Sequence, residues 1–160
     1  MSNPLMQILR HGESRGNIGI NERNPGLTDK GKEQASKVSG FASLVITSNL
    51  RRAKETLSNS NIKYNNLIET DLCREIKQGH VNDYMENEEI VNETNKDLTD
   101  RINKLCEFLC EESKKHDTIL IISHGIFINC FLNLNKNGLQ TIYNCQCLNF
   151  NLVHRAQIKN

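Results

Sequence analysis

The sequence has no long apolar run and no recognisable leader. Its longest uninterrupted apolar stretch is Ile119–Ile122, whereas a membrane-spanning helix needs about 20 mostly apolar residues. A secretory leader places an apolar stretch after basic residues, and the opening letters MSNPLMQILRHG do not follow that order. We therefore expect no membrane association and no secretion, which favours a cytoplasmic protein.

Blocks of like charge are also missing. The chain has 20 Lys and Arg against 19 Asp and Glu, a net charge of +1, and no run of five like charges. Nucleic-acid-binding proteins usually carry a basic stripe, so we expect no nucleic-acid partner. The length of 160 residues fits a single domain over residues 1–160. No pattern indicates an oligomeric state.

The six cysteines do not have the spacing of a zinc knuckle. Cys106 and Cys110 are one helical turn apart, and Cys145 and Cys147 would face the same side of a strand. Four thiols in this arrangement are compatible with zinc, but the usual CxxC pairs are absent. Because free cysteine is among the most frequently buried residue types, we expect reduced core thiols and no metal.

Alternating apolar segments indicate an α/β fold with a largely parallel sheet. Buried strands are predicted at Leu5–Leu9, Leu44–Thr47 and Thr118–Ile122, with a closing strand at Cys145–Val153. Helices are predicted from Thr28 to about Gly40–Ser43, and at Arg51–Ser58, Thr99–Lys114 and Ile126–Leu134. The first of these helices has Thr28 as its N-cap and the small or apolar face Gly31, Ala35, Val38 and Ala42.

The stretch from Asn59 to Leu98 has a weak pattern. It is rich in Asn and Glu and poor in aromatic residues. We expect a strand there, followed by a short irregular lid around residues 77–98.

Reactive side chains follow each of the three predicted inner strands. Arg10–His11–Gly12 follows the first, Arg51–Arg52 the second and His124–Gly125 the third. Ligands bind beyond the carboxyl ends of parallel strands, so two histidines and at least two arginines are expected at one edge of the sheet. Arginine binds phosphate through a planar fork of donors, and a neutral imidazole can attack phosphorus. A phosphate site with a histidine nucleophile is the resulting hypothesis.

Five segments resemble motifs of the histidine phosphatase (phosphoglycerate mutase-like) superfamily. In chain order they are LRHGESRGN (9–17), NPGLTDKGKEQA (24–35), SNLRRAKETL (48–57), CREIKQG (73–79) and ISHG (122–125). Cys73 stands where the family usually has Leu, a difference that concerns packing rather than chemistry. The resemblance implies a three-layer α/β/α sandwich with a mostly parallel central sheet.

The resemblance also implies a role for each matching residue. His11 would be the phosphorylated nucleophile, and Arg10, Arg52 and His124 would bind and polarise the phosphoryl group. Asn17 would be a further phosphate ligand, Glu75 the proton donor, and the backbone around Gly125 would complete the pocket. Arg51 fills a variable position of the motif. Composition alone would not select Glu75 from the 19 acidic residues.

The first expectation is a metal-independent phosphatase, without cofactor, that acts on a small phosphorylated substrate or a phosphoprotein. A cofactor-dependent phosphoglycerate mutase is the first alternative, although such mutases are expected to be longer chains with a larger lid. The Glu-Ile-x-x-Gly form at 75–79 and Glu-Glu-Ile at 88–90 look somewhat like fructose-2,6-bisphosphatase. A protein phosphohistidine phosphatase and a non-catalytic phosphate-binding module stay open.

Overall fold

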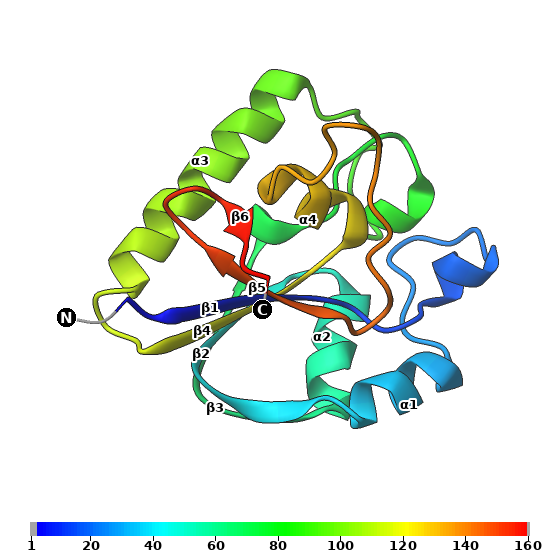
Figure 1. The fold of residues 1–160 in the computed structure, drawn as a ribbon. Coiled ribbons are helices and arrows are strands. Elements are labelled where there is room, and N and C mark those ends of the chain that lie inside the picture. Colours follow the sequence, from blue (N-terminus) through cyan, green and yellow to red (C-terminus); the bar gives the residue numbers. More distant parts are fainter. Residues whose placement is uncertain (1–2, 160) are drawn as a thin grey trace.

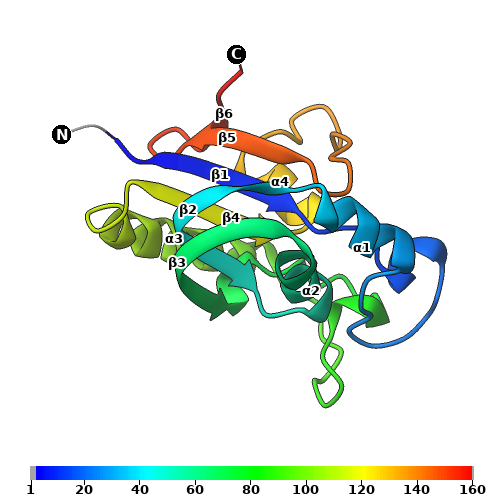
Figure 2. The same ribbon diagram turned by 90° about the horizontal axis from the view of Figure 1, so that it is seen from below.

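The computed structural model describes residues 3–159 and is built on one six-stranded sheet. The strand order is β3-β2-β4-β1-β5-β6, which Figure 2 shows from the sheet edge formed by β3. The strands are β1 (Leu5–Arg10), β2 (Ser39–Ser48), β3 (Asn61–Thr70), β4 (Thr118–Ser123), β5 (Cys147–Asn151) and β6 (Ala156–Gln157). Strands β1 to β4 are parallel to one another, whereas β5 pairs antiparallel with β1 and β6 pairs antiparallel with β5. The predicted α/β fold with a mostly parallel sheet is confirmed.

Four α-helices cover the two faces of the sheet, as Figure 1 shows. Helices α1 and α2 lie on one face and α3 and α4 on the other, which gives the expected three layers. The helices are α1 (Asp29–Ser36), α2 (Arg51–Asn59), α3 (Asn95–Glu112) and α4 (Gly125–Phe131). Short 3₁₀ turns occur at η1 (Arg15–Ile18), η2 (Asp71–Cys73) and η3 (Val81–Asp83).

The inner strands are apolar on both sides because each side packs against helices. Successive residues of a strand point to opposite faces, and two separate core clusters result. One contains Ile119 and Ile121 of β4 with residues of α3 and α4. The other contains Leu120 and Ile122 with Ala53 of α2. This explains why the predicted strands have continuous apolar runs rather than an alternating pattern.

Helix α1 is shorter than the sequence predicted. Thr28 caps it as expected, since its Oγ1 accepts the Gly31 N–H (3.0 Å). The helix ends at Ser36, and the predicted extension to Gly40–Ser43 is wrong. From Ser39 the chain pairs with β3 instead, and Gly40 has φ of +121°, which is outside the helical range. Ala42 is therefore buried in a strand rather than on a helix face.

The bounds of α3 and α4 also differ from the prediction. Helix α3 begins at Asn95 rather than Thr99 because Thr94 and Asp97 form a capping box. Its predicted apolar stripe is correct, with Ile102, Leu105 and Leu109 buried. Helix α4 ends at Phe131 rather than Leu134. The closing strand is restricted to Cys147–Asn151, because Cys145 adopts φ of +61° in the preceding turn.

Between η2 and α3 the chain is irregular. Residues 74–94 contain no element longer than η3. The segment predicted as a lid around 77–98 is therefore irregular up to residue 94, and its last four residues belong to α3. Tyr84 anchors this segment. Its side chain is fully buried, and its hydroxyl donates to the Val91 carbonyl (2.9 Å) and accepts the Gly79 N–H (3.2 Å). Among residues 3–159, no helix has the length and apolar character needed to cross a bilayer.

Candidate active site

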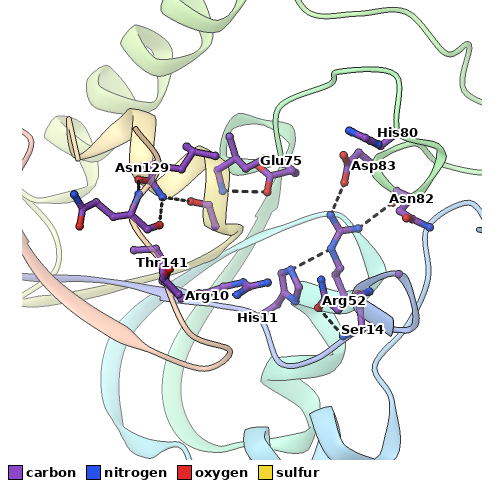
Figure 3. A pocket seen from close by; sticks show the side chains of 17 residues that line it. Arg10, His11, Ser14, Arg52, Glu75, His80, Asn82, Asp83, Asn129 and Thr141 are labelled. Carbon is purple, nitrogen blue, oxygen red and sulfur yellow. Dashed lines mark hydrogen bonds and ion pairs between the residues drawn. The ribbon is translucent and has the colours of Figure 1, made fainter. Parts of the chain in front are cut away.

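Three parallel strands end at one edge of the sheet and carry the predicted residues there. Arg10 at the end of β1 pairs with Ser123 of β4, and Thr47 of β2 pairs with Ile122 of β4. The residues that follow these ends therefore meet, as the sequence predicted. They border a cavity of about 350 Å³, shown in Figure 3.

His11 is buried at the base of the cavity with both ring nitrogens in contact with neighbours. Its Nδ1 lies 2.6 Å from the Gly12 carbonyl, and its Nε2 lies 3.2 Å from Arg52 Nε. A carbonyl can only accept and a guanidinium can only donate. Nδ1 therefore carries the hydrogen, and the lone pair of Nε2 accepts the Arg52 Nε–H. Burial, followed by the charge of Arg52, lowers the pKa of His11 well below its usual value, so the ring is neutral near pH 7.

Arg52 connects the nucleophile candidate to the irregular segment above it. Besides the contact to His11, its Nη1 donates to the Asn82 carbonyl (2.9 Å) and its Nη2 to Asp83 Oδ1 (2.7 Å). Arg52 is not a solvated helix residue, because it is only 4% exposed, and the pair with Glu55 is made by Arg51 instead (2.5 Å).

His124 lies next to His11 but beneath the surface. The two ring centroids are 5.1 Å apart. His124 is completely buried and is not one of the residues that line the cavity. Its Nε2 is 2.8 Å from Ser48 Oγ, whereas its Nδ1 is buried without a hydrogen-bond partner. Burial and the charge of Arg52 lower the pKa of His124 well below its usual value.

Arg10 crosses the cavity wall beside the start of α4. Its Nη1 donates to the Ile142 carbonyl (2.5 Å), while its Nε is buried without a partner. Gly125 lies beside the Arg10 side chain, where an added Cβ would make an ordinary contact 3.5 Å from Nε. Arg10 Nε and His124 Nδ1 are both buried without a hydrogen-bond partner, which is unusual because buried polar groups are nearly always paired. Of these two side chains, that of Arg10 lines the cavity and that of His124 does not.

Glu75 lies at the N-terminus of α4, on the same cavity. Its Oε1 accepts the N–H groups of Ile76 (3.0 Å) and Phe127 (2.8 Å), and its Oε2 accepts that of Ile126 (3.2 Å). Burial raises the pKa of Glu75, although these N–H groups oppose the rise. Oε2 has a single, longer contact, so it is the oxygen with room for a proton.

Asn17 borders the outer part of the cavity. Its Oδ1 accepts the Ser14 N–H (2.9 Å) and its own N–H binds Ser14 Oγ, which closes the turn η1. Its amide nitrogen is therefore the group left to meet a ligand. Cys73, which replaces the family's usual Leu, is fully buried in the core. That position concerns packing, as predicted.

The sequence did not single out two parts of the cavity. Asp83 and Asn82 reach it from the irregular segment, and the loop 139–142 forms its outer wall. Asn129 of α4 holds that loop, accepting the Gln140 N–H (2.7 Å) and donating to the Gln140 carbonyl (3.0 Å). Asn129 is a polar residue in an otherwise apolar helix. This polar residue in an apolar helix is the sequence signal by which Asn129 could have been found.

The six cysteines are free thiols. Within the described part of the chain, no group of three His, Cys, Asp or Glu side chains is arranged to hold a metal ion. Burial raises the pKa of Cys145 to about 11, and that of Cys73 to about 12. Both thiols are therefore uncharged near neutrality.

The sequence profile of the histidine phosphatase superfamily (branch 1) matches residues 6–94. No curated protein sequence matches the chain. Among solved structures, a phosphoglycerate mutase from Thermus thermophilus is similar (TM-score 0.72, 16% identity, 97% of this chain and 96% of that one). The product of a Mycobacterium tuberculosis open reading frame is also similar (TM-score 0.70, 18% identity, 98% of this chain and 95% of that one). A mycobacterial glucosyl-3-phosphoglycerate phosphatase is a third similar structure (TM-score 0.66, 17% identity, 92% of this chain and 91% of that one). At these identities the likeness establishes the fold.

Proposed function

The chain belongs to the histidine phosphatase superfamily, branch 1, and on that basis we propose that it hydrolyses phosphate monoesters through a phosphohistidine at His11. The observation that carries this proposal is the neutral His11 ring, whose Nε2 bears no hydrogen and accepts the Arg52 Nε–H (3.2 Å), a donor that a bound phosphoryl oxygen would take over. A neutral imidazole beside a guanidinium combines a nucleophile with a ligand for the phosphoryl oxygens.

In the first step, His11 Nε2 attacks phosphorus and the bond to the leaving oxygen breaks. Glu75 donates a proton from Oε2 to that oxygen, and the alcohol departs. Arg10, Arg52, His124 and Asn17 bind the phosphoryl oxygens, with Arg10 Nε and His124 Nδ1 supplying donors that are otherwise unpaired. We assign the His124 hydrogen to Nδ1, with Ser48 Oγ as the donor to Nε2 in their 2.8 Å contact. The Gly125 N–H completes the set.

In the second step, water attacks the phosphohistidine, and the phosphorus–nitrogen bond breaks. Glu75, now a carboxylate, takes a proton from that water, so the enzyme returns to its starting state with inorganic phosphate as product. Each step needs only groups of the chain and water. The proposed enzyme is accordingly independent of metals, and we expect EDTA not to inhibit it.

A phosphoglycerate mutase is the second candidate, favoured by the likeness to the Thermus thermophilus protein. The expectation that a mutase would be a much longer chain is wrong, since this chain covers 96% of that mutase. Length therefore does not separate the two activities. Phosphatase and mutase share the first step and differ in whether water or a second substrate receives the phosphoryl group. A protein phosphohistidine phosphatase and a non-catalytic phosphate-binding module are less well supported, given the cavity and the full set of chemical groups. The free thiols accord with a reducing compartment, and we propose the cytoplasm.

The test is to trap the intermediate. Turnover of p-nitrophenyl phosphate, quenched in base, should yield a phosphohistidine on the peptide that contains residue 11. His11→Ala should abolish both the label and turnover, whereas His154→Ala, at an exposed histidine outside the cavity, should keep both. Normal turnover by His11→Ala would overturn the proposal.

A further inference from the structure

We propose that the substrate is a monoester with one phosphate and a small, uncharged leaving group, and that Asp83 disfavours a second anionic group. This inference rests on the proposed function and narrows it to a substrate class. It follows from the charges on the cavity wall, from the position of Asp83 and from the composition of the loop 139–142.

The cavity has arginine side chains for one phosphate group only. Of the Lys and Arg side chains in residues 3–159, only Arg10 and Arg52 line the cavity. Other nearby cations are engaged elsewhere. Arg74 binds both oxygens of Glu88 (2.7 and 2.8 Å), and Arg23 donates to the carbonyls of Met85 and Glu88. A second anionic group on the substrate would therefore meet no guanidinium or ammonium group of its own.

Asp83 places negative charge where the leaving group would lie. Figure 3 shows its carboxylate between Arg52 and His80, across the cavity from Arg10. The carboxylate is held by Arg52 (2.7 Å), and it is largely buried, so water screens it less than an exposed group. His80 lies beside this carboxylate, so the negative charge of Asp83 would offset a positive charge on the His80 imidazole. An anionic leaving group would approach Asp83 at unfavourable energy, whereas a hydroxyl group would not.

The opposite wall is neutral and fixed in place. It consists of Leu139, Gln140, Thr141 and Ile142. Two tethers hold this loop against the site. Asn129 binds both backbone groups of Gln140, and Arg10 binds the Ile142 carbonyl. Aliphatic and hydroxyl groups at fixed positions are suited to an uncharged alcohol. The cavity of about 350 Å³ fits a phosphate with a small attached group.

A matched pair of substrates tests this directly. Glycerol 3-phosphate and 3-phosphoglycerate share the phosphate ester and differ at the far carbon, which is a neutral hydroxymethyl group in one and a carboxylate in the other. We expect kcat/KM at low ionic strength to favour glycerol 3-phosphate by about tenfold or more, because like charges at a site are costly. Salt should reduce this ratio.

Variants then assign the effect to the proposed residues. Asp83→Asn retains an oxygen acceptor for Arg52 but loses the charge, and should lower the ratio several-fold. Glu86→Gln removes the same charge from an exposed position of the same segment and should leave the ratio unchanged. Thr141→Lys adds a cation to the opposite wall and should also lower the ratio. This variant gives an answer even if Asp83→Asn does not fold.

The outcomes separate this inference from the proposed function. If p-nitrophenyl phosphate is hydrolysed but 3-phosphoglycerate is used as well as or better than glycerol 3-phosphate, the inference is overturned and the phosphatase stands. The same holds if neither alcohol ester is accepted, or if Asp83→Asn and Thr141→Lys both fold and leave the ratio unchanged. If no ester is hydrolysed and no phosphohistidine forms, the proposed function itself fails.

Discussion

At the scale of single residues, the site depends on which group holds a proton. His11 and His124 are buried beside Arg52, and their pKa values are lowered. Glu75 and Asp83 are buried carboxyl groups, and burial raises both of their pKa values. These shifts favour the neutral form of both histidines and the protonated form of Glu75, whereas the ion pair with Arg52 opposes the rise in the pKa of Asp83 and favours its carboxylate. Opposite shifts of this kind are typical of acid–base chemistry.

The role of Glu75 predicts a dependence on the leaving group. Glu75→Gln retains one oxygen, which can accept the N–H groups of Ile76 and Phe127 as Oε1 does, but its amide group replaces Oε2 and cannot donate the proton. Hydrolysis of an alkyl phosphate should fall by about 10²–10⁴-fold, the usual contribution of a general acid. Hydrolysis of p-nitrophenyl phosphate, whose leaving group needs little protonation, should fall much less. Steady-state kcat values for the two esters measure this, and equal losses would assign Glu75 to structure or binding.

The pKa shifts also predict the pH profile. His11 must be neutral to attack, so kcat/KM should fall as pH drops through its lowered pKa, below the range of an ordinary imidazole. Glu75 must be protonated, so activity should fall as pH rises through its raised pKa. A bound dianion raises that pKa further in the enzyme–substrate complex, so the basic limb of kcat should lie at higher pH than that of kcat/KM. The result is a bell with its optimum near neutrality or on the acidic side.

Glu75→Gln provides the control for this profile. With p-nitrophenyl phosphate the variant should lose the basic limb and keep the acidic limb. An unchanged basic limb would mean that another group is the acid. Asp83 would then be the residue to replace, since it has a raised pKa and lies on the same cavity.

At the scale of elements, close packing between α1 and the loop after β1 fixes the position of His11. The N-terminus of α1 lies directly against the backbone of this loop. A Cβ at Gly31 would overlap the Glu13 carbonyl, and one at Gly12 would come within 2.7 Å of the Gly31 carbonyl. The Gly12 N–H donates to Thr56 Oγ1 of α2 (2.9 Å). Two helices therefore hold the backbone on either side of the nucleophile.

Gly31→Ala should accordingly disturb the site from a distance. Inserting a methyl group into packed backbone costs about 1–3 kcal/mol, and the backbone at Glu13, two residues after His11, must shift to relieve it. We expect a lower free energy of unfolding in urea together with a lower kcat. Lys32→Ala, at the next and exposed position of α1, should change neither quantity. A Gly31→Ala variant with normal stability and kcat would show that this contact does not position His11.

The sequence predicted the strand ends well and the helix ends poorly. The inner strands β1, β2 and β4 are buried on both faces, so their apolar residues form continuous runs in the sequence. The ends of these runs place His11, Arg52 and His124 just beyond the carboxyl ends of the strands. Val38 and Ala42 continue the helical period of α1, yet pairing with β3 places Ala42 in a strand. That pairing depends on residues about 20 positions away, and a local pattern does not contain it.

Asp83 illustrates the part of the site that the sequence did not reveal. It lies in a segment of mixed polar residues, where nothing in the local letters distinguishes it from Glu86. Its position depends on Arg52 (2.7 Å), on the buried Tyr84 beside it, and on Asn82, whose amide binds the carbonyls of Ile20 and Glu22. Contacts between distant segments place this carboxylate on the cavity.

At the scale of the whole molecule, the fold concentrates positive charge that the sequence spreads evenly. The net charge is only +1, yet Arg10 and Arg52 from different strand ends face one small cavity. Two nitrogens in the described chain, Arg10 Nε and His124 Nδ1, stay unpaired at this point. Unpaired buried groups cost free energy, so the ligand-free molecule is less stable than the same fold with an anion bound.

Inorganic phosphate should therefore stabilise the entire fold. A ligand that binds only the native state contributes about 2.7 kcal/mol at 100 times its Kd. For a chain of this size, each kcal/mol corresponds to roughly 2–4 °C in Tm, so a rise of about 5–10 °C is expected in a thermal unfolding experiment. Orthovanadate should act in the same way.

The matched variants decide whether the gain comes from this site. Arg10→Gln and Arg52→Gln should remove most of the phosphate-dependent rise, because each deletes a guanidinium that the bound anion needs. Arg51→Gln, a neighbouring arginine paired on the surface with Glu55, should keep it. A general salt effect would raise the Tm of all three variants equally, and chloride at the same ionic strength would reproduce it. Equal shifts across the set would mean that phosphate does not bind between Arg10 and Arg52, and the proposed phosphoryl site would have to be abandoned.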